Sequence, residues 1–379
     1  MGGRRDEKLN SEQVRQMLQR SAGLCEFENC AQPLFFDLVS GHACNDGQYA
    51  HIIPSSADGP RGGGDETLEY IASVANRMHL CHKHHEIVDH HVDKYPAHLL
   101  RQMKRKHEDH VAAFRLMLKK TPIMPILFSS DIKGRQTTID YGAVCKAIRD
   151  DARPLQKELP CEMRIDSSAD YGSPRYWEET RKRVTDKVAR LLDESRAVGE
   201  GNVEYGIFPL APMPLIVLFG WLIGDKLPMR VYQLLRDDSA WSWNRDRPIN
   251  RFSSKLLRAG ASDCKRIAIS FSLSFETGKG ALENEDESVP VYVLMAERQG
   301  VDCIAHREDL NQFRDVYYSL MDGIQKRHGS DVEVYIYPSL PVSAAFEIGR
   351  RYMPGVFPKF HIMENMGDGK WVEACEVGK

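Results

Sequence analysis

The spacing of apolar residues predicts several helices in the first part of the chain. Residues 96–119 carry apolar side chains at the three- and four-residue spacing of one helix face, and Pro96 suits the first turn. Residues 7–22 and 141–150 show shorter patterns of the same kind. Residues 55–65 are rich in glycine and serine and predict a flexible loop. No apolar run of about 18 or more residues occurs, so we expect no membrane-spanning helix.

The second half of the chain contains an internal repeat. Residues 202–220 and 331–349 align at a constant offset of 129 residues, with Val, Glu, Ile, two Pro and one Gly recurring. Each copy predicts a strand, a turn that contains proline, and a helix that begins near the second proline, Pro212 or Pro341. Duplication without a role in ligand binding is the alternative interpretation.

Further helices and strands surround the two copies. A helix is predicted before each copy, at 175–194 and 309–327, and a short strand after each copy, at 229–235 and 359–363. Two buried strands are predicted between the copies, at 266–275 and 289–297. Alternating strands and helices predict an α/β domain with a parallel sheet, and two such units predict a pseudo-dimer. The two strand-to-helix turns would share the face at which open α/β sheets bind ligands.

Length and composition fit a cytosolic protein of two domains. The chain has 379 residues, of which 42% are hydrophobic and 28% charged, as is typical of globular proteins. The N-terminus is polar and lacks an apolar signal core, so the nine cysteines do not predict a disulfide framework. The net charge is -3, and residues 1–120 hold 16 basic and 16 acidic residues. Any contact with nucleic acid must therefore come from a local patch.

Cysteine and histidine predict a structural zinc site in the first third of the chain. Residues 42–110 contain 11 of the 14 histidines. Cys25 and Cys30 form one close pair, and Cys81 and His84 form another about 50 residues later. Three thiolates and one imidazole make the closed tetrahedral shell of structural zinc, which would stabilise a small domain with a thin core. The alternative is that these are unrelated buried residues.

A second group of residues surrounds His51. This histidine ends an extended apolar segment, Asn76 lies 25 residues later, and His85 directly follows the proposed zinc ligand His84. Phosphodiester cleavage needs a base that activates water and a divalent cation that neutralises charge. His51 can supply the base, His85 can hold the metal, and the Asn76 amide can orient the loop or the base. The alternative for His51 alone is a buried, hydrogen-bonded histidine.

The segments AHIIP, Asn76 and LCHKHHEIVD resemble the ββα-metal (HNH) endonucleases, in the subgroup that carries a zinc knuckle. The resemblance covers about residues 23–115 and implies that His51 is the general base, Asn76 the central asparagine and His85 a ligand of the catalytic metal. Magnesium is the default ion, with other divalent ions open.

The chain departs from this family at one position. Many members place Asp, Glu or His just before the base, where this sequence has Ala50. The second ligand of the catalytic metal is therefore open among His42, Asp46, Asp89 and water.

A basic cluster follows on the helix predicted at 96–119. Arg101, Lys104 and Arg105 can bind DNA phosphates without reading bases, although a solvated helix face is an equal alternative. Nothing in the sequence resembles a base-reading motif. We therefore expect largely sequence-nonspecific cutting of double-stranded DNA.

Residues 200–365 resemble the SAVED domain, a fusion of two CARF-like Rossmann units. The resemblance is carried by FPLAPMPLIVLFGWLIGDKLPMRVYQL, SWNR, ISFSLSF and IYPSLPVSAAFEIGRRYMP. Together, the two resemblances imply an α+β HNH domain with a zinc knuckle at 1–120, a connector at 121–155 and an α/β SAVED sensor at 156–379. An HNH domain fused to a SAVED domain resembles an effector of the cyclic-oligonucleotide-based anti-phage systems (CBASS).

Candidate ligand contacts lie near the two turns of the repeat. Aromatic rings can stack on bases, and backbone N–H groups at helix starts suit phosphate. The residues expected to contribute are Tyr232, Gln233, Trp241 and Trp243 after the first turn, the helix starts at Pro212 and Pro341, and the hydroxyls of Ser339 and Ser343. Core packing is the alternative for both tryptophans.

The resemblance implies an anti-phage effector DNA endonuclease of the bacterial cytoplasm, with no membrane partner. A cyclic di- or trinucleotide from a partner cyclase would bind the SAVED domain, drive formation of a homo-oligomer and activate the metal-dependent HNH hydrolase. One alternative is a restriction-type HNH nuclease that recognises modified DNA. The other is a non-catalytic zinc-finger adaptor that binds nucleic acid or protein.

Overall fold

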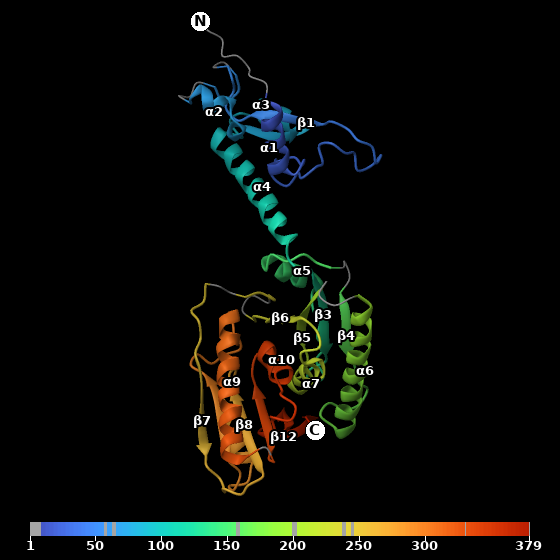
Figure 1. The fold of residues 1–379 in the computed structure, drawn as a ribbon, viewed down its shortest axis with the longest axis vertical. Helices are drawn as coiled ribbons and strands as arrows, with labels where there is room; N and C mark the ends of the chain where they lie inside the picture. Colours follow the sequence, from blue (N-terminus) through green and yellow to red (C-terminus); the bar gives the residue numbers. More distant parts are fainter. Residues whose placement is uncertain are drawn as a thin grey trace. The chain divides into compact units, whose positions relative to one another are not determined.

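The chain folds into two compact units, Met1–Lys119 and Lys120–Lys379, each with its own hydrophobic core (Figure 1). The computed structural model describes residues 9–56, 59–62, 66–156, 160–198, 203–236, 240–243, 246–329 and 331–378. In this part of the chain, no helix combines the length and the apolar character that crossing a membrane requires.

The N-terminal unit is built around two short strands and a helix. Its elements are α1 (Ser11–Ser21), β1 (Gly47–His51), α2 (Leu68–Ala72), the 3-10 turn η1 (Val74–Asn76), β2 (Arg77–Cys81), α3 (His82–His90) and α4 (Ala97–Met117). β1 and β2 pair antiparallel, with His51 opposite Arg77, and α3 begins directly after β2. Ile52, Leu80 and Val88 form the centre of a small core beneath them.

The first half of the C-terminal unit is a four-stranded parallel sheet. Its elements are β3 (Ile123–Ser130), α5 (Tyr141–Asp150), β4 (Cys161–Ile165), α6 (Pro174–Val198), β5 (Glu204–Leu210), α7 (Met213–Ile223) and β6 (Met229–Val231). The strand order is β4-β3-β5-β6. The expectation of a connector at 121–155 is therefore wrong, because β3 is an inner strand of this sheet.

The second half repeats this topology and extends it. Its elements are β7 (Phe252–Arg258), β8 (Arg266–Ser272), α8 (Gly278–Asn284), β9 (Val291–Ala296), α9 (Arg307–His328), β10 (Glu333–Ser339), α10 (Val342–Arg350), β11 (Lys359–Gly367) and β12 (Lys370–Val377). The order β9-β8-β10-β11 matches that of the first half, and antiparallel β7 and β12 border it. The duplication thus covers a complete Rossmann-type unit rather than only one strand and one helix.

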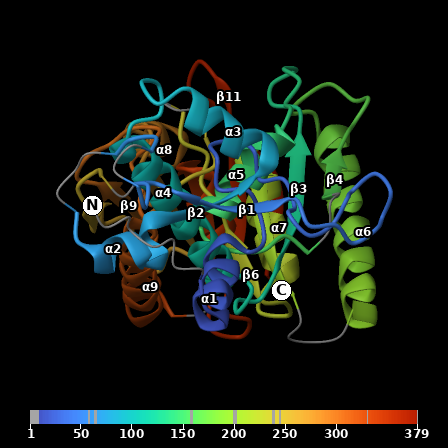
Figure 2. The ribbon, with the colours of Figure 1, turned by 90° about the horizontal axis from the view of Figure 1, so that it is seen from above.

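Two central helices join the halves. α7 and α10 are the helices that follow the repeated strands β5 and β10, and they begin at Pro212 and Pro341, as predicted. The two views place α7 between α6 and α9, which lie on opposite sides of the C-terminal unit (Figures 1 and 2). Phe219 of α7 stacks on Phe128 of β3 and contacts Phe346 of α10, so one core runs through both halves.

Candidate functional site

Four potential metal ligands meet beside the end of β2. One ligand atom from each of Cys25, Cys30, Cys81 and His84 lies within 4.8 Å of the others. The Nδ1 atom of His84 is 3.2 Å from the Cys81 sulfur and 3.7 Å from the Cys25 sulfur. The Cys81 backbone N–H donates to the Cys25 sulfur at 3.3 Å. Three thiols and one imidazole at this spacing fit a tetrahedral zinc ion.

Local structure explains why the four residues meet. Cys81 ends β2 and His84 lies in the first turn of α3, so the two side chains flank one strand-to-helix corner. A tight turn connects Cys25 to Cys30, whose N–H donates to the Phe27 carbonyl at 3.0 Å. The Phe27 ring stacks on His84 at 4.0 Å and holds the imidazole in place. Burial raises the pKa of the Cys25 thiol, so a cation is needed to favour the thiolate.

The predicted base and the predicted metal ligand are connected through one arginine. Arg61 donates to the His51 carbonyl at 3.4 Å and to Asp89 Oδ1 at 2.6 Å. The other carboxylate oxygen of Asp89 lies 3.3 Å from His85 Nε2. The Arg61 side chain is 4% exposed and also binds the Ile52 carbonyl at 2.9 Å. The end of β1 and the last turn of α3 are therefore held together at this point.

Asp89 lies one helical turn after His85 and is an anionic neighbour of it. Burial acts to raise the pKa of Asp89, but hydrogen bonds from His85 and Arg61 outweigh burial and lower the pKa below its ordinary value. The carboxylate is thus ionised at neutral pH and can bind a divalent cation together with the imidazole. Of the alternatives considered for the second metal ligand, Asp89 is the one that contacts His85.

Asn76 has a role in holding the loop after β1. Its side-chain oxygen accepts from the Ile53 N–H at 2.8 Å, and its amide donates to the Ile53 carbonyl at 2.8 Å. A further bond reaches the Ile71 carbonyl at 3.1 Å. The side chain is fully buried. These contacts agree with the loop-orienting role expected for this asparagine, and they fix the chain that follows His51.

The basic cluster on α4 differs from the expectation. Lys104 is 6% exposed and forms ion pairs with Glu108 at 2.7 Å and Glu26 at 3.8 Å, so it is not available to DNA. Arg101 binds Glu66 at 3.1 Å but stays partly exposed, and Arg105 is exposed. The helical spacing that predicted a basic face did not reveal which of its residues faces the core.

The C-terminal unit has a pocket at the carboxyl ends of its strands. The pocket, called here the strand-end pocket, has a volume of about 430 Å³ and takes residues from both halves. Lys133, Gln233 and Arg236 come from the first half, and Phe275, Glu276, Thr277, Ser339, Pro341, Asn365 and Trp371 are among those from the second. This is the edge at which the duplicated turns predicted a ligand site.

Three of the predicted contacts line the strand-end pocket, namely Gln233, Ser339 and Pro341. Ser343 is fully buried and does not line the pocket, and its hydroxyl donates to the Gln233 side-chain oxygen at 2.6 Å. Ser343 therefore positions Gln233, and the expectation of a direct ligand contact is corrected. Pro212 is buried where α7 begins and is not among the residues that line this pocket.

Two of the predicted aromatic contacts belong to the core. Tyr232 is fully buried and stacks on Phe208 at 4.4 Å, and Trp241 is 3% exposed and packs edge-on against the same ring. Neither ring can stack on a ligand base, so these expectations are wrong. Trp243 lines a different cavity, between α5 and α9, where the Arg307 guanidinium lies 5.7 Å from its ring centre.

Several pocket residues were not predicted. Lys133 follows β3, and Phe275 and Glu276 follow β8, the equivalent strand of the second half. The same strand-end argument that selected Ser339 applies to these positions once β3 and β8 are recognised as first strands of the two units. Arg61 lies in the glycine-rich loop, and nothing in its sequence context indicated a contact with Asp89.

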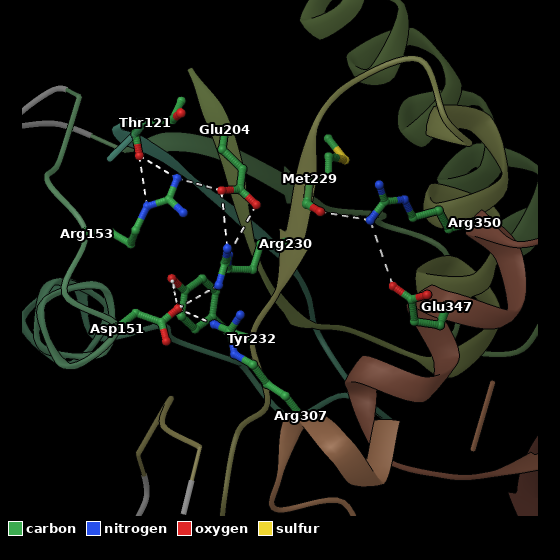
Figure 3. Close-up of polar contacts among 10 residues, drawn as sticks. All are labelled: Thr121, Asp151, Arg153, Glu204, Met229, Arg230, Tyr232, Arg307, Glu347 and Arg350. Carbon is green, nitrogen blue, oxygen red and sulfur yellow. Dashed lines mark hydrogen bonds and ion pairs between the residues drawn. The ribbon is translucent and has the colours of Figure 1, made fainter. Parts of the chain in front are cut away.

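A polar network connects the two halves of the C-terminal unit (Figure 3). Asp151, just after α5, accepts hydrogen bonds from Arg307 of α9, from the Tyr232 hydroxyl at 3.0 Å and from Arg230 at 3.4 Å. Glu204 joins Arg230 to Arg153, which in turn binds the Thr121 carbonyl at 2.9 Å. The start of the C-terminal unit is thus tied to a helix of the second half.

Comparison with known proteins gives one family match. Residues 181–377, more than half of the chain, match the family model of the SMODS-associated and fused to various effectors sensor domain, abbreviated SAVED. None of the curated protein sequences matches the chain.

The chain also matches solved structures of Cap4 SAVED/CARF-domain receptors at low similarity. The Acinetobacter baumannii receptor with the cyclic trinucleotide 3'3'3'-cAAA has 13% identity, a TM-score of 0.45, and coverage of 77% of this chain and 62% of its own. The same receptor with 2'3'3'-cAAA has 14% identity, a TM-score of 0.44 and coverage of 78% and 62%. The Moraxella osloensis receptor has 11% identity, a TM-score of 0.40 and coverage of 77% and 60%. The chain therefore spans about six tenths of the length of these receptors.

Proposed function

The chain belongs to the SAVED family of sensor domains, and on that premise we propose that it is an effector endonuclease controlled by a cyclic oligonucleotide. The ligand binds the strand-end pocket of the C-terminal unit. The N-terminal unit then cuts double-stranded DNA with a divalent cation. One observation carries the proposal. The same chain contains a SAVED sensor domain and an N-terminal unit in which four zinc-type ligands lie beside the segments that carry His51 and His85.

The strand-end pocket has the chemistry that a cyclic oligonucleotide requires. Lys133 and Arg236 can pair with phosphates, and the exposed ring of Phe275 offers an apolar face for a base. The Phe275 side chain is 63% exposed, so its ring is accessible to a ligand at the mouth of the pocket. The volume of about 430 Å³ lies in the range of small-molecule sites.

The proposed nuclease site uses His51 as the base, with His85 and Asp89 as ligands of the divalent ion. When bound, that ion would neutralise charge on the scissile phosphate. The His51 imidazole takes the proton of the attacking water, which requires it to be neutral. Arg61 connects the end of β1 to α3, and Asn76 fixes the chain that follows His51. A zinc ion held by the four-ligand cluster would stabilise the same N-terminal unit.

Control by the ligand requires that the ligand bind the active arrangement more tightly than the inactive one. We propose that self-association provides the active arrangement, as in the family that the sequence resembles. The ligand would then raise DNA cleavage and the size of the particle together.

A plasmid-cleavage assay tests this function. The full chain is incubated with supercoiled plasmid, Mg²⁺ and a panel of cyclic di- and trinucleotides, and light scattering follows particle size. We expect cleavage only with a subset of the ligands, and loss of at least about a hundredfold of the rate in His51→Ala, because general base catalysis contributes that much.

The control variant is His110→Ala, which removes an exposed histidine on α4 and should cut normally. Cutting that survives His51→Ala would remove the assigned base. Absence of cleavage with every ligand, in a protein that still binds one, would favour the non-catalytic adaptor.

A further inference from the structure

The loop after β8 is held rigidly at the mouth of the strand-end pocket. The Ser339 carbonyl accepts from the N–H groups of Leu273 and Ser274, both at 2.9 Å. The Ser339 hydroxyl accepts from the N–H of Phe275, also at 2.9 Å. Three bonds to one residue of β10 therefore fix the loop before it reaches Glu276. A side chain on such a loop can discriminate between ligands, because it is already in place when the ligand arrives.

Glu276 is oriented by a buried hydroxyl cluster. Its Oε1 atom accepts from the Gly278 N–H at 2.5 Å and from the Ser272 hydroxyl at 3.2 Å. Ser272 in turn accepts from the N–H of Thr277 at 3.0 Å and contacts the Ser270 hydroxyl at 2.9 Å. Both contacts to Glu276 use Oε1, so Oε2 remains as a hydrogen-bond acceptor for a ligand.

The charge of the pocket limits which part of a ligand Glu276 can meet. A cyclic oligonucleotide is an anion, and its phosphates would be repelled by a carboxylate. Lys133 and Arg236 supply the cationic groups of the pocket lining. A carboxylate that loses water without gaining a donor is costly, so Glu276 has to face the hydrogen-bond donors of the ligand, which lie on its bases and sugars.

We propose that Glu276 makes the strand-end pocket select rings that contain a base with an exocyclic amino group over rings of uracil alone. This inference rests on the proposed cyclic-oligonucleotide ligand. Adenine, cytosine and guanine each present an amino group at an edge, and carboxylates accept from such groups. The one N–H donor on the edge of uracil lies between two carbonyl oxygens, which repel a carboxylate. Glu276 is thus a specificity-determining residue.

Calorimetric binding to the full chain tests this selection. The probes are cyclic di- and trinucleotides with 3′–5′ linkages that carry only adenine, only guanine, only cytosine or only uracil. We expect the tightest ring to carry an amino base and to bind at least about tenfold more tightly than the uracil ring of the same size, as for one hydrogen bond to a charged group. In Glu276→Gln this ratio should fall by about tenfold, because the amide also donates and tolerates the carbonyl groups of uracil.

The matched control is Glu283→Gln on α8. The Glu283 side chain is 63% exposed and pairs with Lys279, so this substitution should not change the ratio of affinities between amino-base and uracil rings. Glutamine keeps an oxygen for Gly278, and a thermal denaturation curve verifies that the variant folds. If uracil rings bind tightest, or if Glu276→Gln weakens all rings equally, Glu276 does not select the base. Absence of binding by every ring would instead overturn the proposed function, and this inference with it.

Discussion

Gly220 and Gly349 occupy equivalent positions in the two repeats, and each faces the backbone of the other's helix. A Cβ atom on Gly220 would collide with the Phe346 carbonyl and lie 2.9 Å from the Arg350 nitrogen. A Cβ atom on Gly349 would collide with the Val217 carbonyl and lie 2.8 Å from the Trp221 nitrogen. The contacts are reciprocal, because Phe346 and Arg350 are the repeat equivalents of Val217 and Trp221. α7 and α10 thus cross at their only glycines, which permits direct backbone contact.

Gly349→Ala should destabilise the C-terminal unit. The added methyl group meets main-chain atoms that cannot rotate away, so the helices must separate at the centre of the core. We expect the free energy of unfolding to fall by about 3 kcal/mol. All five tryptophans lie in this unit, so fluorescence during urea denaturation reports its unfolding.

The matched control is Gly323→Ala on α9. Nothing lies within 4 Å of a Cβ atom built there, so alanine should leave stability unchanged or raise it by up to about 1 kcal/mol. Equal effects of the two substitutions would show that helix propensity, and not the crossing, determines the result.

Removal of one proposed zinc ligand should release the metal. The purified chain is expected to contain one zinc per molecule by mass spectrometry of the metal content, and Cys81→Ser should contain none. Loss of zinc would unfold much of the N-terminal unit, because metal binding contributes directly to the folding of such small domains. Cys44→Ser is the control, since Cys44 is exposed and lies outside the cluster. Full zinc content in Cys81→Ser would refute the site.

Asp151→Asn should weaken the contact between the two halves of the C-terminal unit. The substitution removes the anion that faces Arg307 and Arg230. Burial already lowers the pKa of Arg307, so the charged guanidinium depends on this carboxylate for compensation. We expect a loss of about 2 kcal/mol in the free energy of unfolding. Asp150→Asn provides the comparison, because Asp150 is exposed and a surface substitution typically changes stability by less than about 0.5 kcal/mol. If both variants unfold alike, the network has no measurable role in stability.

Stability of the C-terminal unit should fall between pH 5 and pH 8 because of Glu364. Burial raises the pKa of this carboxyl from 4.5 to about 7, and Tyr171 donates to it at 2.9 Å. Between these two pKa values the folded state retains a proton that the unfolded state has released. The free energy that this proton contributes to stability is lost as the pH rises through about 7. The loss amounts to about 3 kcal/mol.

Glu364→Gln removes this titration, so its stability should depend less on pH than that of the unmodified chain. Urea denaturation at pH 5 and pH 8 measures both proteins. Parallel pH profiles would contradict the assignment.

The sequence predicted β5–α7 and β10–α10 but missed β3 and β4, although the equivalent strands β8 and β9 were predicted. The two glycines, the prolines and the apolar runs recur at a fixed offset, because β5–α7 and β10–α10 make the same contacts at the crossing. β3 was missed because Pro125 lies within it, and proline is unusual in inner strands. The structure shows that β3 pairs with β4 only from Ile126 onward, so that pairing does not need the missing N–H of Pro125.

The candidate sites show a similar division. The four zinc-type ligands could be selected from their spacing as two close pairs, and Asn76 from the resemblance to the HNH endonucleases. The environment of Tyr232 and Trp241 could not, since an aromatic side chain has the same sequence pattern in a core and in a pocket. Arg61 was not predicted either, because no sequence pattern indicates its contacts with Asp89 and the Ile52 carbonyl.

The loops after β3 and β8 are topological equivalents, yet one brings Lys133 to the pocket and the other brings Phe275 and Glu276. A ring made of identical nucleotides would therefore encounter two different walls, and its units would cease to be interchangeable once bound. A ring of mixed composition would have one preferred rotational setting in the pocket. If the pocket binds such rings, the order of three different bases around a ring would then affect binding, and not only which bases the ring contains.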